Sequence, residues 1–231
     1  MSTYRPEKIV CSICGAENEY PCLASLSSNG KPDLDLRPAE TVRSTMPVWV
    51  NECPNCGYVS SEVSDKTSIT IGFLKSPEFI TCDGIPFASD LARKFYKYYK
   101  INMADHNSED AFHAILHAAW ACDDIHDSDN AKLCRLFSLP LIDRLIRETA
   151  DDKDTYMLIK ADLLRRTGKY NELVAGYSSV KFSDPLLNSI LAFQIKRAQE
   201  HDPRCYSVSD VPKSMQQRLL SVFSIFRSRN Q

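Results

Sequence analysis

The sequences CSICG at residues 11–15 and CPNCG at residues 53–57 decide how this chain folds. In each, two residues between the cysteines allow a tight turn that aims both sulfurs at one ion. The following glycine adopts backbone angles that a side chain would resist. Two such turns supply four tetrahedral thiolate ligands with no open position for water, which predicts one structural zinc ion. The predicted ligands are Cys11, Cys14, Cys53 and Cys56.

The spacing between the two pairs leaves the identity of the metal open. The 38 residues between Cys14 and Cys53 exceed the spacing of a compact ribbon. A surface loop near residues 25–40 absorbs the excess, because closure entropy grows only with the logarithm of loop length. The order Cys-x-x-Cys-Gly, then Cys-Pro-x-Cys-Gly, is also similar to the rubredoxin pattern, so iron is the alternative to zinc. A redox pair is disfavoured, since neither pair begins a helix after a strand.

The other five cysteines have simpler interpretations. Cys122 and Cys134 lie on helix faces among apolar residues, which predicts buried small hydrophobic side chains. Cys22 and Cys82 lie in or beside the metal-binding part and could replace a ligand. Cys205 precedes a tyrosine in an expected loop and shows no partner in the sequence.

Composition indicates an ordinary globular protein. Of 231 residues, 43% are hydrophobic and 25% are charged, and the net charge is -2. No run of about 18 apolar residues predicts a membrane span, and residues 1–8 begin no export signal. The odd cysteine count, nine, also argues against a disulfide scaffold. We therefore expect a cytoplasmic protein with reduced thiols and no membrane partner.

Charge disfavours nucleic acid as a partner. Residues 1–86 contain 7 Lys and Arg against 11 Asp and Glu, and residues 87–231 contain 21 against 19. Four thiolates around a divalent ion add a further charge of about -2 to the first part. The metal-binding part should therefore repel a phosphate backbone.

The residue pattern changes from extended to helical near residue 87. Residues 1–86 are rich in turn-forming side chains and contain short extended runs at 47–50 and 67–71, so they read as a zinc-ribbon-like domain of strands and loops. Residues 66–82 as a whole fit a strand or a helix equally well. Residues 87–231 predict an antiparallel helical array. The predicted fold class is α+β, mainly α.

Capping residues place the helices of the second part. One is expected after Ser89, one from Ser108, one from about 130 to 149 with a break or kink at Pro140, and one after Asp184-Pro185. Two more flank Gly168, and a last one covers about 212–229. Short connections between them predict antiparallel neighbours.

Residues 154–185 resemble a tetratricopeptide unit. With Gly168 on the inter-helix glycine of that family, Ala161 occupies the small packing position, Tyr177 an aromatic position and Pro185 the terminal proline. Lys160 departs from the pattern, because the family has a leucine there. A single unit cannot bury its apolar face alone, so the neighbouring helices must complete the array.

Two weaker constellations were considered as sites. Glu109, His113 and His117 share one helix face and could form a second metal site, although a helix surface or groove lining is the simpler interpretation. The run from 93 to 100 alternates cations with aromatics, as single-strand nucleic-acid platforms do. On a helix the aromatics and the cations separate onto two faces, which favours an amphipathic helix. The cations of this candidate patch are Arg93, Lys94, Lys97 and Lys100.

Residues 37–40, the run from 48 to 58 and the helical tail together resemble a group of uncharacterised bacterial proteins. These proteins join a paired-cysteine zinc ribbon to tetratricopeptide-like helices, so the resemblance supports the architecture and supplies no substrate. We therefore expect a non-enzymatic scaffold whose helical groove binds a protein or peptide. The alternatives are a nucleic-acid-binding module, which would also use Arg218, Arg227 and Arg229, and a rubredoxin-like iron redox partner. The groove could also be filled by the C-terminus of the chain itself.

Overall fold

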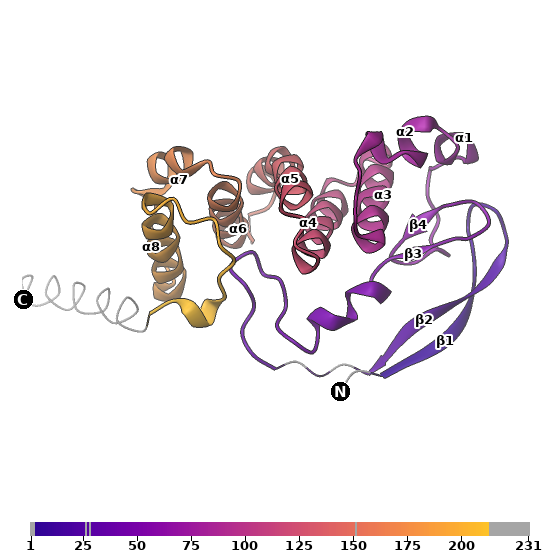
Figure 1. Cartoon of the computed structure of the whole chain (residues 1–231), viewed down its shortest axis with the longest axis horizontal. Coiled ribbons are helices and arrows are strands. Elements are labelled where there is room, and N and C mark those ends of the chain that lie inside the picture. The colour runs from indigo at the N-terminus through magenta and orange to yellow at the C-terminus, as the bar shows by residue number, and fades with distance from the viewer. Residues whose placement is uncertain (1–2, 26, 28, 151, 213–231) are drawn as a thin grey trace, which may run out of the picture. The chain divides into compact units, whose positions relative to one another are not determined.

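The computed structural model of the chain describes residues 3–25, 27, 29–150 and 152–212. It is mainly helical, with a small antiparallel sheet near the N-terminus (Figure 1), which confirms the predicted fold class at this level. The chain divides into two compact units: unit 1 contains residues 1–30 and 39–144, and unit 2 contains residues 31–38 and 145–231. The predicted boundary at residues 86 and 87 concerns independent folding and stays a prediction.

Unit 1 begins with two hairpins whose turns carry the cysteine pairs. Strand β1 (Thr3–Val10) pairs antiparallel with β2 (Glu17–Ser25), and β3 (Asn51–Glu52) pairs antiparallel with β4 (Val59–Ser60). The turn of the first hairpin, residues 11–16, is called knuckle 1, and that of the second, residues 53–58, is called knuckle 2. Each hairpin therefore presents one pair of cysteines.

Short helical turns form where the sequence predicted a strand, at 47–50, and in the undecided residues 66–82. Residues Arg43–Val48 form the 3-10 helix η1, stabilised by burial of Met46 and by a 2.8 Å hydrogen bond from the Trp49 indole to the Thr45 hydroxyl. The strand expected at 47–50 is therefore wrong. The undecided stretch contains α1 (Ile71–Leu74), α2 (Pro77–Ile80) and the 3-10 turn η2 (Cys82–Gly84).

Helical turns form in residues 66–82, which the sequence left undecided, for a local reason. The Thr70 side chain accepts a hydrogen bond from the amide of Phe73, and the Ser76 side chain accepts one from the amide of Phe79. Such caps satisfy amides that a helix leaves free at its start. The two caps therefore favour helical turns over an extended chain.

Three longer helices follow: α3 (Asp90–Ala104), α4 (Ser108–Asp124) and α5 (Ser128–Glu148). Ser89 caps α3 as predicted, by accepting from the amide of Ala92 at 3.1 Å. Helix α4 is buried on most sides, and its many alanines allow α3 to pack closely against it. Helix α5 runs through Pro140, so of the predicted break or kink the break is wrong and the kink stays a prediction. A proline removes one amide donor, and the remaining helix bonds hold this helix together.

Unit 2 is built on α6 (Lys153–Arg166), α7 (Tyr170–Tyr177) and α8 (Pro185–Gln199), followed by the 3-10 turn η3 (Val208–Asp210). The helices begin and end close to where the sequence predicted, with Gly168 at φ 82° between the first two and Asp184 capping the third. Helix α7 packs against both α6 and α8. The tetratricopeptide-like arrangement stays a prediction, and the helix expected at 212–229 lies outside the described residues.

Residues 31–38, here called the strap, belong to unit 2 although they lie in the sequence between the two knuckles. The amide of Leu34 donates to the carbonyl of Tyr206 at 2.8 Å, and the amide of Val208 donates to the carbonyl of Pro32 at 2.9 Å. These bonds join the strap, antiparallel, to the segment around Ser207. The chain therefore enters unit 2, returns to unit 1 and enters unit 2 again.

Within the described residues, no helix combines the length and the apolar character needed to cross a membrane.

Candidate metal centre

The two knuckles have the same backbone geometry. In knuckle 1 the amide of Cys11 donates to the carbonyl of Ala16 at 2.9 Å, and the amide of Gly15 donates back to the carbonyl of Cys11 at 2.9 Å. Knuckle 2 repeats both bonds at the corresponding positions, at 2.7 and 2.8 Å. The glycines have φ angles of 71° and 77°, a region that side chains disfavour. The predicted role of the glycine in each motif is therefore confirmed.

The four cysteine sulfurs lie close enough together to bind a metal ion. All four are within 4.8 Å of one another. The Sγ atoms of Cys11 and Cys56 are 3.7 Å apart, as are those of Cys14 and Cys53. A tetrahedron with metal–sulfur bonds of about 2.3 Å has edges of about 3.8 Å. A disulfide needs about 2.05 Å, so these are free thiols arranged at the spacing of a tetrahedral metal site.

Burial and hydrogen bonding differ between the four cysteines. Cys11 and Cys53 are buried, Cys56 is half-buried and Cys14 is exposed. Burial alone would raise the pKa of Cys53, but the amides of Cys56 and Asn55 donate to its sulfur and hold the pKa below its usual value. Burial raises the pKa of Cys56. A bound divalent cation would deprotonate all four thiols, so binding should release protons.

Side chains of β2 line the inner side of the cluster. The Asn18 amide group donates to the Cys53 sulfur at 3.8 Å. Tyr20 lies two residues further on the same strand and is only 6% exposed. Burial raises its pKa to about 12, and charge on Cys53 and Cys11 adds to the rise. Sequence analysis missed both residues, although their alternation directly after knuckle 1 was the available signal.

Knuckle 2 is anchored to α3 by charged side chains. Glu52, next to the first cysteine of that knuckle, accepts from Lys97 at 2.7 Å and from Arg93 at 3.3 Å. Lys97 is buried and lies 5.5 Å from the ring centroid of Phe79. We expected this lysine on an exposed cationic face. It is instead a buried partner that positions the knuckle.

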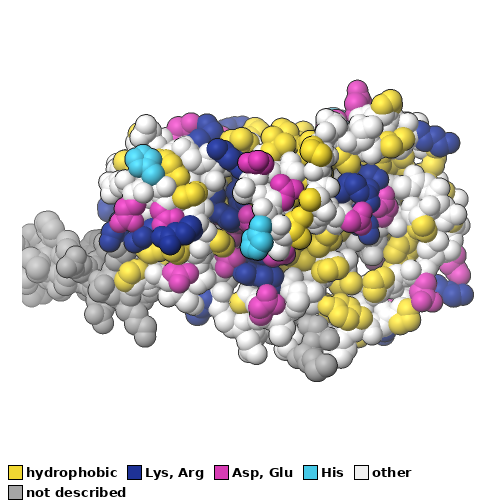
Figure 2. Space-filling view, in the orientation of Figure 1, with side chains coloured by type: hydrophobic (Ala, Val, Ile, Leu, Met, Phe, Trp, Pro, Cys, Tyr) yellow, Lys and Arg dark blue, Asp and Glu magenta, His cyan; other side chains and the backbone are white. Residues whose placement is uncertain are grey.

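The candidate nucleic-acid patch is neutralised by carboxylates. Besides the two pairs with Glu52, Arg93 and Lys94 contact Asp90 at 2.6 and 3.5 Å, and Lys100 contacts Asp83 at 2.9 Å. On the face shown in Figure 2, Lys and Arg side chains lie beside Asp and Glu side chains. The aromatic residues do not form an open platform either, since Phe95 is buried. The C-terminal cations Arg218, Arg227 and Arg229 lie outside the described residues.

The second metal site gains no support. Within the part of the chain that the structure describes, the four-cysteine cluster is the one group of three or more potential ligands gathered around a common point. His117 instead packs among aromatic rings, 5.2 Å from Trp49 and 5.1 Å from Phe95 between centroids. Burial lowers the pKa of His113, against the opposite effect of Glu109. These residues fit the simpler interpretation, a helix surface or groove lining, with Glu109 exposed.

The remaining cysteines lie apart from the cluster. Cys122 and Cys134 are fully buried, as predicted. Neither Cys22 nor Cys82 joins the group of metal-binding sulfurs. Cys205, for which the sequence showed no partner, donates to the carboxylate of Asp33 in the strap at 3.4 Å.

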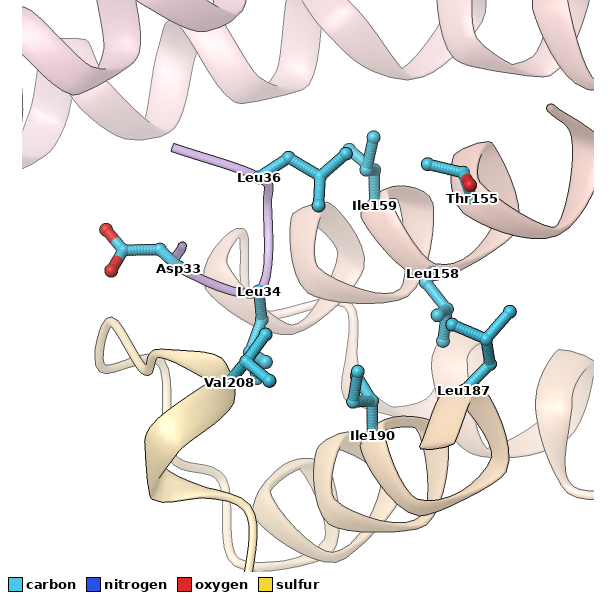
Figure 3. Close-up of a pocket in the computed structure, with 9 residues that line it drawn as sticks. All are labelled: Asp33, Leu34, Leu36, Thr155, Leu158, Ile159, Leu187, Ile190 and Val208. Atoms are coloured by element: carbon cyan, nitrogen blue, oxygen red, sulfur yellow. The ribbon is translucent and has the colours of Figure 1, made fainter. Parts of the chain in front are cut away.

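Unit 2 contains an apolar cavity of about 80 Å³ beside the strap (Figure 3). Aliphatic side chains from α6, from α8, from the strap and from η3 converge on it, while the carboxylate of Asp33 points away. A buried cavity of about 150 Å³ takes up benzene, so this one suits a smaller aliphatic group. The lining residues are Asp33, Leu34, Leu36, Thr155, Leu158, Ile159, Leu187, Ile190 and Val208.

Buried charges hold the strap and the C-terminal segment against α6. Arg165, which is fully buried, donates to the carbonyls of Asp202 and Arg204 at 2.9 and 2.6 Å. Arg166 contacts the buried carboxylate of Asp35 in the strap at 3.6 Å. Sequence analysis assigned the strap to a surface loop because its Asp-Leu alternation is polar on average. The partners that bury it follow about 130 residues or more later in the chain, beyond the reach of local patterns.

Comparison with known proteins adds no family. No family model matches the chain, and no curated protein or solved structure matches it. Its function is therefore argued from the cysteine cluster and from the cavity of unit 2.

Proposed function

We propose that this chain is a non-enzymatic, zinc-binding interaction protein. In this proposal a structural zinc ion joins the two knuckles, and the helical part presents a groove to a protein or peptide partner. The observation that carries it is the cysteine cluster, with two sulfur pairs at 3.7 Å, close to the edge of a zinc–thiolate tetrahedron. Four protein thiolates leave no position for water or substrate, which favours a structural ion over a catalytic one.

The cavity of unit 2 supports the second half of the proposal. Its walls come from two helices and the strap, and they are aliphatic apart from Thr155 and the backbone side of Asp33. Leu36, at its rim, is 46% exposed, and Leu186, at the start of α8, is 39% exposed. Peptide grooves commonly take one apolar anchor side chain in such a place. A peptide with a leucine or isoleucine anchor is the partner class that fits.

The proposed family architecture, a zinc ribbon joined to tetratricopeptide-like helices, is consistent with this function. The positive φ of Gly168 between α6 and α7 and the burial of Ala161 on α6 support such a unit. A cytoplasmic location, where thiols stay reduced, suits the metal site. The nucleic-acid alternative has no observation in its favour, because the four cations on α3 are paired with carboxylates.

Metal analysis of the purified chain tests the first half of the proposal. We expect about one equivalent of zinc per chain in the parent. The Cys53→Ser variant should lose this zinc. Iron at one equivalent with a visible charge-transfer colour would instead support the rubredoxin-like alternative, because iron accepts the same sulfur geometry. A chain that binds neither metal would refute the proposal.

Methyl NMR tests the groove. Blocked peptides with a central leucine are expected to shift the methyl signals of Leu158 and Ile190, and peptides with phenylalanine at that position should shift them less. Leu158→Gln places a polar group on the cavity wall and serves as the variant that should abolish the shift, with exposed Met103→Gln as the control. Equal shifts in the Leu158 variant would locate binding elsewhere.

A further inference from the structure

The Tyr20 hydroxyl is a buried polar group without an acceptor. Tyr20 lies on β2 and is 6% exposed, and its oxygen makes no hydrogen bond within the part of the chain that is described. Buried hydroxyl groups nearly always have a partner, because desolvation without one is costly. A hydrogen-bond acceptor close to the Tyr20 oxygen would therefore explain why this hydroxyl is buried.

The sulfur of Cys53 is the acceptor that the site offers. Residues Asn18 and Tyr20 are two apart on a strand, so their side chains lie on the same face. Asn18 already donates to the Cys53 sulfur at 3.8 Å. A metal-bound thiolate accepts hydrogen bonds better than a neutral thiol does.

We propose that Tyr20 and Asn18 are positioning residues of the metal site and both donate hydrogen bonds to the metal-bound thiolate of Cys53. This inference rests on the proposed metal binding and adds the side chains that orient and tune one ligand. Cys53 is fully buried and already accepts from Asn18. Its neighbour across the cluster, Cys14, lies 3.7 Å away and is exposed.

The shielding makes the site asymmetric. Donors to a thiolate withdraw electron density from the metal–sulfur bond and fix the direction of the sulfur. Cys53 should therefore be the ligand least open to alkylation or dissociation, while exposed Cys14 is the first to leave. The two residues act on the metal only through Cys53.

Cobalt substitution tests the proposal with three variants. Tyr20→Phe removes the hydroxyl alone, Asn18→Ala removes the second donor, and Tyr4→Phe removes a hydroxyl from an exposed tyrosine on the neighbouring strand as a matched control. Loss of an outer donor typically weakens metal affinity by 10–100-fold. We expect about tenfold weaker cobalt and zinc binding in each of the first two variants. The thiolate-to-cobalt band should also move to longer wavelength, which a merely structural defect would not cause.

The outcomes separate this inference from the proposed function. If the parent chain binds cobalt, and Tyr20→Phe and Asn18→Ala both keep its affinity and band position, the inference is wrong while the metal site stands. If the parent binds neither cobalt nor zinc, the proposed function fails. Should Tyr20→Phe not fold, NMR of the cadmium-113-loaded parent decides. A slowly exchanging Tyr20 hydroxyl proton coupled to cadmium supports the inference, and a freely exchanging one contradicts it.

Discussion

Removing the metal from the four cysteines is expected to loosen the strap in unit 2, although the strap contributes no ligand. The metal joins Cys14 to Cys53 and so closes the 38-residue loop that carries the strap. Without it, the loop is closed by weaker contacts, such as the 3.0 Å hydrogen bond from the amide of Ser12 to the carbonyl of Val63. The strap must then dock against a larger loss of chain entropy.

The size of this effect follows from loop closure. A cross-link that closes a loop of this length restricts the unfolded chain by about 4 kcal/mol. Since 1.4 kcal/mol corresponds to a factor of ten, this sets an upper limit of several hundred-fold on the change in strap opening. Strand β2, η1 and strand β3 lie in the same loop and share the effect. We therefore expect the strap to open about 10 to 100 times more often in the metal-free chain.

Hydrogen exchange measures this opening directly. The amides of Leu34 and Val208 carry the two bonds between the strap and the C-terminal segment. Peptides covering 31–38 and 205–211 should exchange faster after chelation, while peptides from α8 keep their rate. Metal analysis of the same samples verifies removal. Unchanged exchange at both strap amides in demonstrably metal-free protein would refute the loop-closure argument.

Three further outcomes are expected. A limiting amount of iodoacetamide should modify Cys14 before Cys53 in the metal-bound chain, as read by peptide mass spectrometry, and the reverse order would contradict the burial asymmetry. Ala161→Leu should overpack α6 and lower stability by about 1–3 kcal/mol in thermal melts, whereas Lys160→Ala should lower it by no more than about 0.5 kcal/mol. If Lys160→Ala were the more damaging change, the tetratricopeptide register would be wrong. Asp202→Asn should destabilise unit 2 at pH 7 by about 1–3 kcal/mol, and the difference from the parent should shrink below about pH 4.

The sign of the last prediction follows from the charged neighbours of Asp202. Arg204 donates to its carboxylate at 2.6 Å, and the Tyr206 hydroxyl also donates to it; the two hold the pKa of Asp202 well below its usual value. A depressed pKa stabilises the fold above the unfolded-state pKa of about 3.9, and this contribution is lost as the pH falls further. Acid titrations that follow the stability of the parent and of Asp202→Asn in parallel check this sign. A difference that grows as the pH falls below about 4 would contradict it.

The cysteine cluster could be predicted from sequence because its information is local. Two residues between cysteines and a glycine after them define a knuckle, and a turn of this kind forms wherever the chain places it. The caps at Ser89 and Asp184 and the glycine at 168 are equally local, and the helices begin and end there. Each of these signals acts within about five residues.

The strap and the environment of Lys97 could not be predicted, because their partners are distant in sequence. In the sequence alone, Asp33 and Leu34 look like part of a polar loop. Their burial depends on the segment around Tyr206 and on the buried arginines of α6. In the sequence alone, Lys97 looks like an exposed cation, because the carboxylate of Glu52 that pairs with it is distant in the chain. In both places a buried charge is stable only because it is paired. Composition and periodicity do not reveal such pairs.

The position of the strap in the sequence also delays completion of unit 2 during synthesis. Cys205 leaves the ribosome 172 residues after Asp33, its partner in the strap. At about 5–20 residues per second, the strap waits roughly 10 to 30 s for the segment that covers it. Until α6 has been synthesised, Leu34 and Leu36 have no apolar partner from the helices of unit 2, so the nascent chain offers a binding site for chaperones. A gene fragment that starts at residue 145 would encode the helices of unit 2 with one wall of the cavity missing.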